Sequence, residues 1–245
     1  MATDDVMVVG QGPLKVVAVH GIQGTRDAWL PLARALSDRC TFVLPNLPGR
    51  GRAMAPVDAQ ACSLDAFAEV LRQTLADHVD GAFVLAGWSM GVSVALAYLA
   101  SASRMPAELL LLSGTPRLNA VEWFKAGSQD ALLDAIAERE RRLGLQDAAD
   151  HRTVAWSWES IRGTDQRGEL RRVACPTLVI HGSDDTDCPL SHGVMLADGI
   201  PHAELHVLHG AGHSLLTQHT AEIAAHLRRR WRMADDRQSK PQETA

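Results

Sequence analysis

The sequence predicts an α/β fold, a doubly wound and mostly parallel sheet with helices on both faces. Two observations lead to this prediction. Short apolar runs that fit buried strands alternate along the chain with segments of helical periodicity. The chain has 245 residues, 46% of them hydrophobic, which is enough for one sizeable core. We therefore expect one domain of alternating strands and helices that carries an insertion.

The strands are predicted from their apolar, β-branched composition and from the turns beside them. They cover residues 14–19, 40–44, 82–86, 108–113, 176–181 and 204–208. The helices are predicted from apolar residues at helical spacing. They cover residues 27–36, a segment that begins after Ser63 as its N-cap, the segment that follows residue 89, and a final amphipathic helix with Ile223, Leu227 and Trp231.

The alternation of strands and helices breaks down between the strands at 108–113 and 176–181. This interval holds two or three helix-like patterns, notably over 130–143, and three of the six tryptophans. An insertion placed just after a strand lies over the carboxyl ends of the strands, where open α/β sheets bind ligands. We therefore expect a core formed by residues 1–116 and 174–233, a small helical cap over 117–173, and a disordered polar tail over 234–245.

Charge and hydropathy exclude several classes of partner. The net charge of -5 and the pI near 6.1 argue against a nucleic-acid surface, which needs clustered Lys and Arg. The N-terminus is acidic where a secretory signal is basic, and no stretch reaches the roughly 18 apolar residues of a membrane span. We expect a cytoplasmic protein without a nucleic-acid partner. Its cysteines, at positions 40, 62, 175 and 188, are too widely spaced for a paired metal motif and are expected to pack as reduced residues.

One serine lies on a tight turn between a predicted strand and an apolar helix. The turn at 87–91 has the sequence Gly-Trp-Ser-Met-Gly, so glycines occur two residues before and after Ser89. These glycines let the strand and the helix approach closely, and the sharp turn lifts the serine clear of the sheet. Because an exposed alcohol is not by itself nucleophilic, Ser89 also needs a base, an acid that orients the base, and donors for an oxyanion.

With this turn, the chain resembles the α/β-hydrolases, and three further sites match that family in the family's order. They are His-Gly-Ile at 20–22 after the first long strand, an Asp-rich segment at 181–189 after another strand, and Gly-His at 212–213 after the last strand. The resemblance covers the chain to about residue 231, apart from the cap. It implies that Ser89 is a nucleophile and His213 its general base, with an acyl-serine intermediate and no cofactor.

The resemblance also implies the remaining catalytic groups. The backbone amides of Ile22 and Met90 are expected to stabilise the oxyanion. Three carboxylates compete for the role of the acid, and the family's spacing from glycine to acid to proline favours Asp185 and leaves Asp184 as the alternative. Asp187 is better explained as a cap of the turn or of the following helix.

Closely spaced histidines raise the alternative of a metal site, at positions 202, 206, 209 and 213. The second of them lies on a predicted strand and the third begins a turn, so their side chains need not converge. No cysteine or carboxylate completes a recognisable ligand motif. We therefore do not favour zinc and expect no metal.

The short cap and the Gly-Trp-Ser-Met-Gly turn resemble small carboxylesterases, including the pimeloyl-ACP methyl ester esterase group, and enol-lactonases. Val92 and Asn46 occur where relatives often have glycine and aspartate, which bears on the subfamily rather than on the chemistry. The resemblance implies a small-molecule ester, lactone or thioester substrate, free or carrier-bound. Residues considered for an apolar acyl pocket are Trp29, Trp88, Trp123, Trp156 and Trp158.

Two other functions fit the same pattern. One is a biosynthetic enzyme that uses the same triad for acyl transfer, cyclisation or release of a carrier-bound thioester. The other is a non-catalytic binding module, since a fold can be retained without its chemistry.

Overall fold

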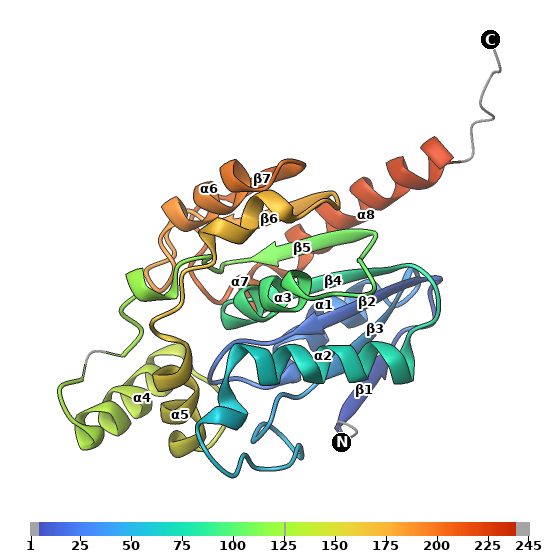
Figure 1. Ribbon diagram of the computed structural model, residues 1–245. Coiled ribbons are helices and arrows are strands. Elements are labelled where there is room, and N and C mark those ends of the chain that lie inside the picture. Colours follow the sequence, from blue (N-terminus) through green and yellow to red (C-terminus); the bar gives the residue numbers. More distant parts are fainter. Residues whose placement is uncertain (1–4, 125, 239–245) are drawn as a thin grey trace.

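A computed structural model describes residues 5–124 and 126–238 of the chain, and its centre is a seven-stranded sheet (Figure 1). The strand order is β1-β3-β2-β4-β5-β6-β7. The strands are β1 (Val6–Val9), β2 (Leu14–Val19), β3 (Cys40–Pro45), β4 (Phe83–Trp88), β5 (Glu108–Leu112), β6 (Thr177–Gly182) and β7 (Ala203–Leu208). All neighbouring pairs are parallel except β1 with β3. The predicted fold class, a mostly parallel α/β sheet, is confirmed.

The antiparallel edge strand β1 is the one strand that the sequence did not predict. Its register runs from Val6 opposite Pro45 to Val9 opposite Phe42. The strand has four residues, rich in valine, and it pairs with β3 at the edge of the sheet. Such antiparallel strands at the edge of a parallel sheet are common in α/β folds.

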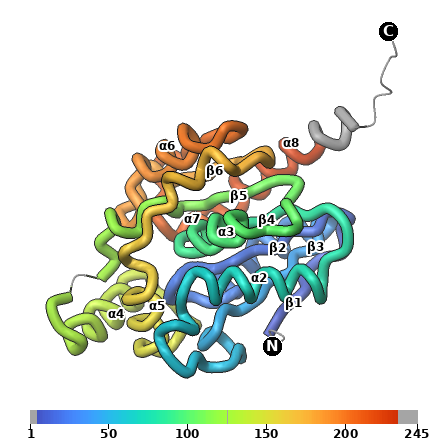
Figure 2. Tube along the Cα trace, in the orientation of Figure 1, coloured from blue at the N-terminus to red at the C-terminus, as the bar shows by residue number. Residues whose placement is uncertain are grey.

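Helices cover both faces of the sheet (Figures 1 and 2). On one face are α2 (Leu64–His78), α3 (Met90–Ala100) and α6 (Leu190–Gly199), and on the other are α1 (Leu30–Ala35), α7 (Leu215–Gln218) and α8 (Thr220–Gln238). Alternate residues of each central strand enter the two cores. In β4, Leu85 packs with α2 and α3, whereas Val84 and Ala86 pack on the opposite side.

The first residues of α2 and α1 are set by an N-cap serine and by a proline, respectively. The Ser63 hydroxyl oxygen accepts a hydrogen bond from the Ala66 amide at 3.2 Å, so the predicted N-cap of α2 is confirmed. The segment predicted as one helix over 27–36 begins instead with the short 3-10 helix η1 (Arg26–Trp29). Pro31 lacks an N–H and fits only at the start of a helix, so α1 begins at Leu30.

The last helix is longer than the sequence predicted. Helix α8 ends at Gln238, so the first five residues of the tail expected to be disordered, 234–238, are helical. The sequence there, Ala-Asp-Asp-Arg-Gln, contains no glycine or proline, and the first breaker is Pro241. Residues 239–245 lie outside the described residues. Within 5–124 and 126–238, no helix combines the length and hydropathy that a bilayer crossing requires.

Residues 117–173, the segment between β5 and β6 that is expected from the sequence to be a cap, are called the cap below. It contains η3 (Leu118–Ala120), α4 (Gln129–Leu143), α5 (His151–Ile161) and η4 (Arg167–Arg172), with α4 and α5 side by side at one end of the sheet (Figure 1). The cap contacts the loops that follow two strands. The Ala149 amide donates to the Gln23 carbonyl after β2, and Trp123 Nε1 donates to the Asp187 carbonyl after β6, both at 2.9 Å. The cap therefore lies over the carboxyl ends of the strands.

Candidate active site

Ser89 is the residue between β4 and α3, and its backbone is strained. Its φ is 58° and its ψ is -122°, a region that side-chain-bearing residues rarely occupy. The two glycines permit this turn: a Cβ on Gly87 would lie 2.3 Å from the Gly91 carbonyl oxygen, and a Cβ on Gly91 would lie 2.3 Å from the Val19 carbonyl oxygen. The sequence pattern around Ser89 thus reflects close backbone packing beneath the turn.

The structure brings Ser89, His213 and Asp185 together from three separate segments. His213 Nε2 lies 2.8 Å from Ser89 Oγ, and His213 Nδ1 lies 3.1 and 3.0 Å from the two Asp185 carboxylate oxygens. All three residues are buried. Asp184, the alternative acid, is exposed, and its carboxylate accepts a hydrogen bond from the Ser183 hydroxyl.

The environment of Asp185 keeps its carboxylate ionised. Burial alone raises the pKa of this group, but the hydrogen bond from His213 and the Cys188 amide outweigh it and lower the pKa below its usual value. The Asp187 amide also donates to Asp185 Oδ1, at 3.0 Å. The His181 ring, at the end of β6, donates from Nε2 to the Cys188 carbonyl at 2.7 Å and so holds this turn.

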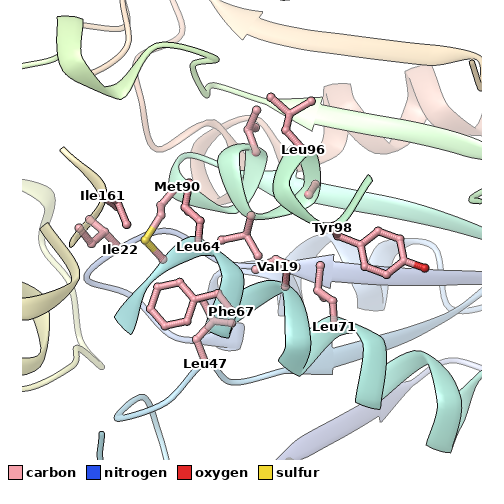
Figure 3. Packing of buried hydrophobic residues seen from close by; sticks show 14 of the residues in the cluster. Val19, Ile22, Leu47, Leu64, Phe67, Leu71, Met90, Leu96, Tyr98 and Ile161 are labelled. Carbon is pink, nitrogen blue, oxygen red and sulfur yellow. The ribbon is translucent and has the colours of Figure 1, made fainter. Parts of the chain in front are cut away.

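The Ile22 and Met90 amides lie where two buried segments end beside Ser89. Met90 is the first residue of α3, so its N–H has no acceptor within the helix and lies at the positive end of the helix dipole. Both side chains belong to the core on the α2 and α3 face, and Figure 3 shows them near Leu64 and Phe67 of α2. The side chains are thus fixed by packing, and the role of the two backbone amides as oxyanion donors stays a prediction.

The clustered histidines do not converge. His202 and His209 are exposed, and His206 of β7 stacks on His226 of α8 with ring centroids 4.0 Å apart. In the described part of the chain, no three His, Cys, Asp or Glu side chains are placed to hold a metal ion.

Of the five tryptophans considered for a pocket, one lies beside His213 and three lie in the cap. Trp88 lies 5.5 Å from the His213 ring between centroids, and its Nε1 donates to the His213 carbonyl. In the cap, Trp123 and Trp158 pack against each other with centroids 5.6 Å apart, and the Arg152 guanidinium covers the Trp156 ring.

Trp29, the fifth tryptophan considered to line or support a pocket, does not reach the protein surface. Its side chain is fully buried in the core between the sheet and α1, together with Leu32 and Leu36. Trp29 lies at the junction of η1 and α1, where the chain packs against the sheet face opposite α2 and α3. The position of an aromatic residue in the sequence does not reveal which face of the sheet it will cover.

A cavity of about 270 Å³ lies between the cap and the core beside His213. Trp88 and Ser214, the chain neighbours of Ser89 and His213, contribute to its wall, and the loop 143–147 that follows α4 closes it from the cap side. Gly24 and Thr25, just before η1, and Asp27 and Ala28 of η1 also line it. Neither Ser89 nor His213 lines this cavity, which is separated from them by Trp88 and Ser214.

A parallel α/β sheet with a serine on a strained turn after a central strand defines the class of α/β-type hydrolases. The chain matches the alpha/beta hydrolase family over residues 16–226 and belongs to that family, which confirms the resemblance seen in the sequence.

Curated relatives and solved structures agree with this assignment. The chain is 29% identical to the pimeloyl-[acyl-carrier protein] methyl ester esterase of Nitrosomonas europaea over 87% of this chain and 94% of the relative. It is 27% identical to the polyketide synthase ThaQ of Burkholderia thailandensis over 89% of this chain but 12% of that protein. The esterase EaEST from Exiguobacterium antarcticum has the same fold, with a TM-score of 0.77, 21% identity, and coverage of 91% of this chain and 92% of that chain.

Proposed function

We propose that the protein is a serine hydrolase that cleaves a carboxylic ester, lactone or thioester through an acyl-serine intermediate. The observation that carries the proposal is the continuous hydrogen-bond chain from Ser89 Oγ through His213 to the Asp185 carboxylate. A non-catalytic binding module has no need of a strained serine aligned with a histidine and a buried carboxylate, so this arrangement favours an enzyme.

In the proposed mechanism, His213 Nε2 takes the proton of Ser89 Oγ as the oxygen attacks the substrate carbonyl. The amides of Ile22 and Met90 stabilise the negative charge that develops on the carbonyl oxygen. Asp185 holds His213 in the tautomer with the Nδ1 proton and stabilises the imidazolium. His213 then gives the proton to the leaving alcohol or thiol, and water hydrolyses the acyl-serine by the same steps in reverse.

The proposed mechanism determines the side of Ser89 on which the leaving group lies. Because His213 delivers the proton to the leaving oxygen or sulfur, that part of the substrate has to lie on the histidine side of Ser89. The similarity to pimeloyl-[acyl-carrier protein] methyl ester esterases supports an ester substrate whose acyl part is attached to a carrier.

A second candidate function is the release or transfer of a carrier-bound acyl thioester with the same three residues. The similarity to a 12% portion of a polyketide synthase favours it as the alternative, because the matching portion covers most of this chain. The two functions differ in the bond that is cleaved and in the group that accepts the acyl chain.

The proposed function is tested by comparing three acyl donors: a short p-nitrophenyl ester, a methyl ester of an acyl-carrier-bound dicarboxylic acid, and the matching thioester without the methyl group. We expect hydrolysis of the p-nitrophenyl ester and release of methanol from the second donor, with the carrier thioester left intact. Mass spectrometry of the carrier distinguishes the products. Cleavage of the thioester in preference to the methyl ester would support the second candidate, and no turnover of any donor would contradict both.

A further inference from the structure

In the loop that follows β2, three successive carbonyls, those of residues 21–23, accept hydrogen bonds. The Gly21 carbonyl lies 2.8 Å from His20 Nδ1, the Ile22 carbonyl accepts from the Arg50 guanidinium at 2.7 Å, and the Gln23 carbonyl accepts from the Ala149 amide. With its carbonyls held in this way, the loop has its peptide planes fixed on both sides of Ile22.

His20 is a neutral residue with a defined tautomer. The Leu47 amide donates to His20 Nε2 at 3.1 Å, so Nε2 is an acceptor and the ring proton is on Nδ1. Complete burial, helped by the nearby Arg50 charge, lowers the pKa of His20 to about 3 and keeps the ring neutral. Nδ1–H therefore donates to the Gly21 carbonyl. The N–H of that same peptide group belongs to Ile22.

Arg50 is a buried cation held by neutral acceptors. Its side chain is fully buried, and its guanidinium donates to the carbonyls of Pro48 and Ile22 and to the Ser157 hydroxyl of α5, while it lies over the Phe67 ring. Burial lowers its pKa to about 10, which leaves it charged at neutral pH.

The burial of Arg50 is costly for the fold. Among the described residues, no carboxylate lies within ion-pair distance of Arg50, and its Nε has no partner. The Asp150 charge acts on Arg50 only from beyond ion-pair distance. A buried charge without a directly bonded counter-ion is expensive, and an apolar side chain of similar volume is often as stable or more so. Packing alone therefore does not account for an arginine at this position.

We infer that His20 and Arg50 are positioning residues of the oxyanion hole, fixing and polarising the two peptide groups on either side of Ile22. The inference rests on the proposed function, in which the Ile22 amide binds the oxyanion. A hydrogen bond to a peptide carbonyl strengthens the N–H of the same peptide as a donor, which is the effect of His20 on Ile22. Arg50 adds a positive charge near the site where negative charge develops, in surroundings that screen it weakly.

This role predicts that substitutions of His20 or Arg50 weaken the stabilisation of the transition state and leave substrate binding nearly unchanged. Interactions that strengthen only as the oxyanion forms lower kcat when they are removed and leave KM nearly unchanged. They also weaken the binding of a trifluoromethyl ketone, which forms a tetrahedral oxyanion adduct with the serine. A purely structural role predicts lower thermal stability without this parallel change in kcat and inhibitor binding.

The test measures kcat, KM and the Ki of a trifluoromethyl ketone with the full chain and a p-nitrophenyl ester. Arg50→Met and His20→Leu are expected to lower kcat by about 10- to 100-fold, with KM changed by about twofold at most and Ki raised by the same factor as kcat falls. Arg50→Lys retains the charge and His20→Asn retains a donor near the Nδ1 position. These variants are expected to recover most of the activity.

Arg104→Met is the matched control. The Arg104 guanidinium also lies over a phenylalanine ring, that of Phe83, and donates to two backbone carbonyls, those of Leu75 and Gly81, but it is not part of the loop after β2. Its kcat is expected to remain within about twofold of the wild type.

Folded Arg50→Met and His20→Leu variants with unchanged kcat and Ki would overturn this inference but not the proposed function. A loss of kcat without a change in Ki would do the same. If Arg50→Met does not fold, the inference is tested by kcat, KM and Ki of His20→Leu, Arg50→Lys and His20→Asn. A wild-type protein that neither hydrolyses the ester nor binds the ketone would instead overturn the proposed function and this inference with it.

Discussion

Replacing Ser89 by alanine is expected to lower kcat/KM for a p-nitrophenyl ester by at least about 10⁴-fold. The substitution removes the only oxygen aligned with His213 Nε2 among the described residues, and residual catalysis can come only from binding and from the oxyanion donors. The fold is expected to persist, because Ser89 Oγ makes its hydrogen bond to His213 and packs no further group into the core. Steady-state kinetics and a thermal unfolding curve check the two expectations together.

Ser93→Ala is the matched control for this prediction. Ser93 is also a buried serine, one turn further along α3, but its hydroxyl donates to the Thr115 carbonyl and not to a histidine. Its activity is expected to remain within about threefold of the wild type, with a small loss of stability from the lost hydrogen bond. A Ser89→Ala variant as active as Ser93→Ala would show that Ser89 is not the nucleophile.

Replacing Asp185 by asparagine is expected to lower kcat by about 10⁴-fold while the fold is retained. Asp185 Oδ1 also accepts from the Asp187 and Cys188 amides, so the asparagine carbonyl oxygen has to take that position. Its NH₂ group then faces His213 Nδ1 and favours the tautomer with the proton on Nε2. In that tautomer His213 cannot accept the Ser89 proton.

The same substitution changes how stability depends on pH. The pKa of Asp185 is lowered in the folded protein, so the ionised carboxylate contributes stability above its unfolded pKa, and this contribution is lost as the pH falls through the folded pKa. Asp185→Asn removes the contribution, so its unfolding free energy is expected to fall less on acidification than that of the wild type. Chemical denaturation at several acidic pH values measures the difference.

Asp184→Asn is the control for the acid. Asp184 is exposed and pairs with the neighbouring Ser183 hydroxyl, so both activity and acid sensitivity are expected to match the wild type. A large loss of kcat in Asp184→Asn with an active Asp185→Asn would reverse the assignment of the acid.

Local patterns in the sequence were sufficient for the fold class and for most elements. The central strands are apolar on both faces because helices cover both faces, so their runs stand out without any knowledge of the partners. The turn at 87–91 is equally local, because a side chain at Gly87 would clash with the backbone of Gly91, four residues further along. Features of this kind depend on neighbours along the chain and are therefore predictable.

The features that the sequence did not reveal depend on distant partners. Strand β1 is defined by its pairing with β3, and Trp29 is buried because η1 packs under the sheet. The contacts of His20 and Arg50 are with residues distant in the chain: His20 accepts from the Leu47 amide, and Arg50 donates to Ser157, which is 107 positions away. An arginine in a Pro-Gly-rich loop is ordinarily exposed, so only the fold shows that Arg50 is buried.

The most direct test of the proposed nucleophile is covalent labelling of the full chain with a fluorophosphonate, followed by intact mass measurement and peptide mapping. The proposed mechanism predicts one adduct per chain, on Ser89, formed rapidly in the wild type, slowly in His213→Ala and not at all in Ser89→Ala. Labelling of Ser89→Ala at the wild-type rate, or an adduct mapped to another residue, would contradict it.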